Sequence, residues 1–248
     1  MSGPDAAADS AGVPWAGRTL TPQPFAGDDG AADPALAAAL AAADAERAAV
    51  ALLTARVFVP VVAVLGDDPA PIGPHGRRVD KSADMAVATL VAPDGRRALP
   101  VFSGTAALAA WDAAARPVPS EGPRAALSAV QDGCSALLVD PGSSHALLLP
   151  RPALWALGQG RAWVPPGRDP EVADAVRAAV AGLPGVHGVR TEPGEEAGVV
   201  VVALGVRPGL DAGELSALVD AVRAALAGSE LLTERADALA LRVLPAPH

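Results

Sequence analysis

The most constraining feature of this sequence is its high content of glycine and proline. The 248 residues include 25 glycines and 25 prolines. Proline breaks the interior of helices and strands, and glycine weakens both, so one continuous helical array is excluded. The chain is therefore expected to be a series of short helices and short strands joined by turns.

The first part of the chain predicts a mixed domain over residues 34–160. A helix is expected over 34–53, because an aspartate N-cap is followed by a proline at the first helical position. A β-branched run at 57–63 predicts a strand. Alternating apolar residues around Asp-Gly and Pro-Gly turns predict hairpins at 85–102 and 136–149. Short helices are expected between these hairpins.

The second part predicts a smaller domain over residues 171–245, with the order α–β–β–α–β. Asp211 and Glu214 have the spacing of a capping box, so a helix is expected to begin there. Residues 161–170 are expected to be a linker, and 1–33 a disordered arm. The predicted fold class is thus α+β, with two small mixed domains, each a hairpin-containing sheet with helices packed on it.

Charge and cysteine content narrow the class of protein. The net charge is −9, and residues 171–248 hold six arginines against eleven acidic residues. A chain without a basic face is not expected to bind nucleic acid. The single cysteine, Cys134, excludes an intrachain disulfide and fits a reducing compartment, so a cytoplasmic location is expected. No apolar stretch is long enough to span a bilayer, so membrane insertion is not expected.

No motif of catalysis, metal binding or cofactor binding is recognisable. Cys134 and His145 lie near Asp140, but Cys134 enters an expected buried strand, where a lone cysteine usually has a packing role. The four histidines are isolated, without the spacing of a zinc site. Gly158 and Gly160 lack the third glycine of a dinucleotide fingerprint. We therefore expect no catalytic residues, no metal and no cofactor.

The strongest local cluster of polar residues lies in the loop 77–84 and the hairpin turn that follows it. Charged residues there are candidates for binding an anion or a partner, although charge is also common in solvated loops. Two further candidates stand at the ends of elements. The candidate binding residues are Arg77, Lys81, Asp84, Arg97, Arg116 and Asp140.

Five short stretches of the first part carry a resemblance to a known family. They are 81–87 (KSADMAV), 94–102 (DGRRALPVF), 109–111 (AAW), 115–119 (ARPVP) and 132–141 (DGCSALLVDP). On these stretches, residues 81–158 resemble the SseB family, which is named for enhanced serine sensitivity. The C-terminal part is similar, more loosely, to a second domain that some members carry. The resemblance implies an α/β N-terminal domain in a cytoplasmic bacterial protein, and it implies no established reaction.

Two functional hypotheses follow. The first is a non-catalytic binding or regulatory protein that acts through a protein partner or self-association. The second is a sensor of an amino-acid-related small molecule, or an uncharacterised enzyme, with its site between the two domains or around the candidate residues. Binding of RNA through the arginines of the first hairpin is a third, weaker route.

Overall fold

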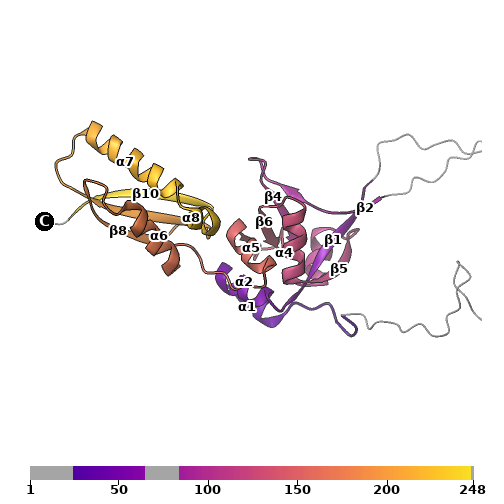
Figure 1. Cartoon of the computed structure of the whole chain (residues 1–248). Coiled ribbons are helices and arrows are strands. Elements are labelled where there is room, and N and C mark those ends of the chain that lie inside the picture. The colour runs from indigo at the N-terminus through magenta and orange to yellow at the C-terminus, as the bar shows by residue number, and fades with distance from the viewer. Residues whose placement is uncertain (1–24, 65–83, 247–248) are drawn as a thin grey trace, which may run out of the picture.

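The computed structural model describes residues 25–64 and 84–246, and it shows an α+β fold, as predicted from the sequence. Two bodies follow one another along the chain (Figure 1). The first runs from α1 to α5 and contains two sheets, and the second runs from α6 to β10 and contains one. Each body has its own apolar core.

The elements of the first body are α1 (Pro34–Ala41), α2 (Ala45–Leu52), β1 (Arg56–Val64), β2 (Asp84–Val87), β3 (Leu90–Val91), β4 (Arg97–Val101), α3 (Thr105–Trp111), β5 (Arg116–Glu121), α4 (Gly122–Gln131), β6 (Ala136–Val139), β7 (Leu147–Leu149) and α5 (Arg151–Gly158). Those of the second body are α6 (Pro170–Val180), β8 (Val186–Pro193), β9 (Val199–Val206), α7 (Ala212–Ala227), α8 (Glu230–Arg235) and β10 (Ala238–Pro245).

The two sheets of the first body share strands from distant parts of the sequence. One has the order β2-β1-β5 and is antiparallel, and the other has the order β3-β4-β6-β7, in which β4 and β6 are parallel. A single bridge between Phe58 and Phe102 joins the sheets. Buried leucines and alanines from α1, α2, α4 and α5 pack against the second sheet and form the main core.

Two local predictions for this body were wrong. The expected helix over 34–53 is broken into α1 and α2, because Asp44 caps a new helix by accepting a hydrogen bond from the backbone N–H of Arg47, and Ala43 before it has a φ of +51°. The expected hairpin over 85–102 is only β3 and β4, since β2 pairs with β1 instead. The hairpin of β6 and β7 is confirmed.

The end of the expected N-terminal arm is bound to the body. Asp28 accepts two hydrogen bonds from the guanidinium of Arg56, at 2.5 and 2.8 Å, and the same guanidinium donates to the carbonyl of Ala31 at 2.6 Å. The carbonyl of Gly30 accepts the backbone N–H of Thr105 at 2.9 Å. Residues 28–31 therefore form a strap that covers the start of α3.

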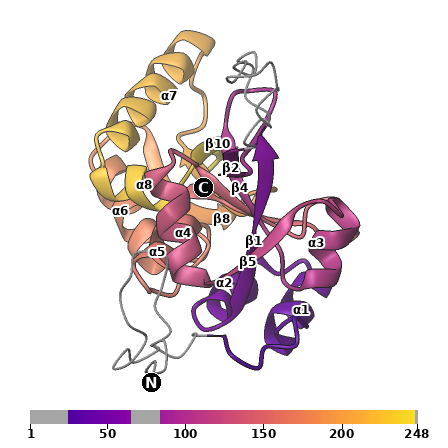
Figure 2. The same cartoon turned by 90° about the vertical axis from the view of Figure 1, so that its right-hand side faces the viewer.

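The second body is a three-stranded sheet with helices on one face (Figure 2). Strand β9 is central, with β8 antiparallel on one side and β10 parallel on the other. The predicted capping box is present, because Asp211 accepts the N–H of Glu214 while the Glu214 carboxylate accepts the N–H of Asp211. Apolar residues of α6, α7 and β9 fill the core between the helices and the sheet. Helix α8 was not predicted.

The expected linker between the bodies is packed rather than extended away from them. Trp163 is 4% exposed and belongs to the core of the first body. Arg168 forms an ion pair of 2.7 Å with Glu46 in α2. The backbone of Gly167 approaches Pro193 so closely that an added Cβ would lie 2.5 Å from the proline Cα. Residues 163–168 therefore contact both α2 in the first body and the end of β8 in the second.

Candidate functional site

The structure does not bring the predicted binding residues together. Arg77 and Lys81 lie outside the described residues, and Asp84 is described only through its pairing with Val64 in the β1–β2 ladder. Arg97 starts β4, whereas Asp140 follows the end of the parallel strand β6. These two residues therefore lie at opposite ends of one sheet. Arg116 is exposed and starts β5, which belongs to the other sheet.

Asp140 has a structural role that its surroundings explain. It is 7% exposed, and its two carboxylate oxygens accept hydrogen bonds from the backbone N–H of Ser103 at 2.7 Å and from the Ser103 hydroxyl at 2.6 Å. Its φ is +49°, a left-handed conformation that aspartate tolerates better than most residues. The carboxylate thereby ties the loop after β6 to the loop after β4.

Two other features also have structural roles. Arg96, in the first hairpin, is paired with Asp94 of the same turn at 2.6 Å, so its charge is partly neutralised there. Cys134 is buried, and burial raises the pKa of its thiol, with a smaller opposing effect from Arg97. A thiol with a raised pKa is a poor nucleophile at neutral pH, which agrees with a packing role.

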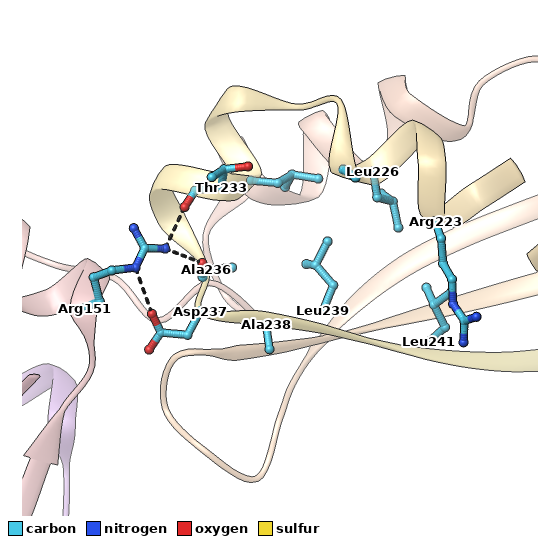
Figure 3. Close-up of a pocket in the computed structure, with 11 residues that line it drawn as sticks. Arg151, Arg223, Leu226, Thr233, Ala236, Asp237, Ala238, Leu239 and Leu241 are labelled. Carbon is cyan, nitrogen blue, oxygen red and sulfur yellow. Dashed lines mark hydrogen bonds and ion pairs between the residues drawn. The ribbon is translucent and has the colours of Figure 1, made fainter. Parts of the chain in front are cut away.

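A pocket of about 400 Å³ that combines apolar and polar groups lies between α7, α8 and β10 (Figure 3). Arg151 of α5 stands at one end and Arg223 of α7 at the other. Apolar walls with a few convergent polar groups are the usual composition of a ligand pocket. The apolar walls are formed mainly by Leu226, Leu232, Leu239 and Leu241.

Arg151 joins the two bodies at this pocket. It lies in the first turn of α5, and its Nη2 donates to the carbonyls of Thr233 and Ala236 at 2.7 and 2.9 Å (Figure 3). These carbonyls are at the C-terminal end of α8, where helical carbonyls have no partner within the helix. The Nε of Arg151 lies 3.4 Å from a carboxylate oxygen of Asp237. A cation from the first body thus caps a helix of the second.

Asp237 is the carboxylate of the pocket, and its environment is unusual for an acid. Burial raises the pKa of Asp237, and the nearby charge of Arg151 offsets part of that effect. Its backbone N–H donates to the carbonyl of Gly198 at 2.9 Å, which begins the pairing of β10 with β9. A perturbed acid beside a fixed cation in a pocket is a common property of binding sites, although structural ion pairs show it as well.

A second hollow of about 550 Å³ adjoins the pocket and shares Arg151 and Thr233 with it. Trp155, one turn after Arg151 in α5, lines this hollow and is 42% exposed. The guanidinium carbon of Arg151 lies 5.6 Å from the centre of its ring, within the range of a cation–π contact. Glu230 and Glu234 of α8 line the opposite side. An exposed tryptophan beside fixed charges favours recognition of a partner.

The alternative hypothesis from the sequence was a small-molecule site either between the domains or around the candidate residues, and it named none of Arg151, Trp155 or Asp237. The only local signal was the placement of Arg151 between two prolines, Pro150 and Pro152, which fixes the start of α5. Its pairing with α8 and β10 joins distant parts of the chain, so no local pattern contains it.

Neither a metal cluster nor a membrane span is found in the part of the chain that the structure describes. Among residues 25–64 and 84–246, no group of three or more histidine, cysteine, aspartate or glutamate side chains is placed to hold a metal ion. No helix of these residues is both long and apolar enough to cross a bilayer.

Comparison with known proteins gives one match. The family model of the SseB protein N-terminal domain matches residues 33–156, which cover the first body up to α5. The match ends before the second body, so the looser resemblance of that part stays a prediction. Neither a curated protein nor a solved structure matches the chain.

Proposed function

The chain belongs to the SseB family, and from this premise we propose that it is a non-catalytic, cytoplasmic binding and regulatory protein of a bacterium. Its binding site is the pocket between α7, α8 and β10, together with the hollow around Trp155. We also propose that the chain divides functionally into the SseB-like domain at 34–160 and the smaller domain at 171–245.

One observation carries the proposal: the pocket combines an apolar floor with a cation that is already held in place. Arg151 makes two hydrogen bonds to carbonyls of α8 and lies beside Asp237, so its position is fixed before any ligand arrives. A preorganised charge above leucine side chains lowers the entropic cost of binding. In contrast to the pocket groups, the two other polar candidates have structural roles. Asp140 binds Ser103, and burial raises the pKa of the Cys134 thiol.

The test uses a photo-crosslinking amino acid in the full-length chain, produced in the source bacterium. Replacing Trp155 places the crosslinker in the proposed site, and replacing Leu127 of α4, which is 48% exposed against 42% for Trp155, gives a matched control. We expect a discrete protein adduct from position 155 only. Arg151→Lys, which keeps the charge but loses the planar fork, should weaken the adduct. Equal adducts from both positions, or none from 155, would contradict the proposal.

The pocket also supports a second candidate, a sensor of a small amino-acid-related molecule. Arg151 and Asp237 present opposite charges at one end of the apolar floor, which is the arrangement needed for a zwitterion with an apolar side chain. Thermal stability of the purified chain should then rise with serine or a related amino acid and be unaffected by nucleotides. No stabilisation across such a panel would exclude this candidate.

A further inference from the structure

Strand β10 is an edge strand without the features that usually prevent further pairing. Natural edges are shortened, bulged or interrupted by proline. In the sheets that the structure describes, β3 and β7 are very short, β5 contains Pro117 and Pro119, and β8 has a register shift between Val186 and Gly188. Strand β10 pairs with β9 from residue 238 to 245 without a shift, and its proline is the last residue.

The free side of β10 offers backbone hydrogen-bonding groups at alternate residues. The N–H of Ala246 donates to the carbonyl of Val206, which lies in β9. Since backbone groups of neighbouring strand residues point to opposite sides, the even-numbered residues of β10 pair with β9, and the backbone groups of Leu239, Leu241 and Val243 point away from it. The side chains of these three residues are half-buried and pack against the core of the second body.

The pocket lies directly beside this free edge. The side chains of Leu239 and Leu241, whose own backbone groups face the free side, turn toward α7 and line the pocket (Figure 3). A strand added to β10 would continue the same alternation, so every second side chain of it would face the groove between the edge and α7. Main-chain pairing and an apolar pocket are thus available to one extended segment.

The charges of the pocket indicate the chemistry of that segment. Its lining contains two arginines, Arg151 and Arg223, against one carboxylate, Asp237, although the chain as a whole has a charge of −9. Arg223 is 69% exposed, and its contact with Asp220 is a loose 3.7 Å, so it is free to bind another carboxylate. The pocket therefore complements an apolar side chain that is accompanied by a negative charge.

We propose that β10 binds an extended peptide segment as a fourth strand of the C-terminal sheet, with an apolar side chain in the pocket and an adjacent carboxylate on Arg223. This inference rests on the proposed function and names the class of its partner. A second copy of the chain fits less well, because residues 238–245 contain Arg242 and no acidic residue.

The experiment presents two libraries of random eight-residue peptides to the full-length chain. One library ends in a free carboxylate, and the other continues into a fixed Gly-Ser tail, so that a chain terminus is distinguished from an internal aspartate or glutamate. Enriched peptides are synthesised with a fluorescent label, and their affinity is measured by polarisation. We expect enrichment of an apolar residue next to a carboxylate in one of the libraries.

Two pairs of variants separate strand addition from general adhesion. Val243→Pro removes an outward N–H and should weaken binding about tenfold or more, whereas Val243→Ala also shortens the side chain but keeps that N–H and should bind like the native chain. Arg223→Glu should also cost about tenfold. Its control is Arg177→Glu on α6, which has a similar exposure of 64% and the same i,i+3 aspartate partner.

Three outcomes would overturn the inference. They are no enrichment from either library, enriched peptides that bind Val243→Pro as well as the native chain, and a dimer in light scattering that Val243→Pro dissociates. The last would assign the edge to a second copy. If one of these occurs while the adduct at position 155 persists, the proposed function stands and only strand addition fails.

Discussion

Replacing Asp140 should destabilise the protein, and its hydrogen bonds and backbone conformation determine how much each replacement costs. Asp140→Ala removes both acceptors of Ser103 and leaves a buried N–H without a partner. Hydrogen bonds to a charged group contribute roughly 1.5–3 kcal/mol each, and they are not fully additive. The expected loss is therefore about 3–4 kcal/mol of unfolding free energy.

The other two replacements separate the causes. Asp140→Gly loses the same bonds but relieves the left-handed φ of +49°, so it should be about 1 kcal/mol less harmful than alanine. Asp140→Asn retains an acceptor for the Ser103 N–H, and its amide can donate to the serine hydroxyl, so about 1 kcal/mol is expected. Asp132→Ala, at an exposed residue of the same body, should change stability by about 0.5 kcal/mol or less.

The assay is thermal unfolding followed by circular dichroism, supported by urea titration. A loss of 1 kcal/mol lowers the midpoint by roughly 2–4 °C in a chain of this size, so alanine should lower it by about 10 °C. The predicted order of damage is alanine, then glycine, then asparagine. Asparagine as harmful as alanine would refute the role of the hydrogen bonds, and glycine worse than alanine would refute the role of the left-handed backbone.

Three further predictions concern the junction, the N-terminal strap and the buried tryptophan. Gly198→Ala should lower thermal stability by about 1–3 kcal/mol, because its Cβ would lie 2.5 Å from the Asp237 carboxylate, whereas Gly188→Ala, with nothing within 4 Å, should be neutral. The hydrogen bond from Arg56 lowers the pKa of the Asp28 carboxyl from its usual value. The stability that this hydrogen bond adds is present above the usual pKa and is lost as the pH falls through the lowered pKa. The thermal unfolding midpoints of the native chain and of Asp28→Asn should therefore converge in acid. Trp163→Ala should lower the free energy of unfolding by about 3–5 kcal/mol. Trp163→Phe should lower it far less, because it removes a buried N–H that has no partner among the described residues. Thermal melts of both variants measure the difference.

Local patterns predicted the elements whose causes are local. The capping box of Asp211 and Glu214, the β6–β7 hairpin and the start of α1 at Pro34 each depend on a few neighbouring residues, and the structure has all three. The division of residues 34–53 into two helices also has a local cause, since Asp44 is a good N-cap. That signal was masked by the high helix propensity of the alanines around it.

The candidate site depended on contacts that no local pattern contains. Arg97 was a candidate from the charge of its turn and Arg116 from its place at the end of an element, but the strands that carry them belong to different sheets. Asp140 was a candidate binding residue, but its carboxylate accepts a hydrogen bond from Ser103, which connects the ends of the parallel strands β4 and β6. Strand pairing between distant segments decides which polar residues meet, and propensity does not encode it.

Arg151 links the joining of the two bodies to the binding that we propose. Its guanidinium caps α8 and contacts Asp237, and its side chain also forms one wall of the pocket. A ligand carboxylate that draws Arg151 toward itself would weaken those contacts, and a ligand that leaves them intact would strengthen the junction by excluding water from them. Under the proposed function, a ligand that changes these contacts on binding would change how strongly the two bodies are held together, because one cation serves both.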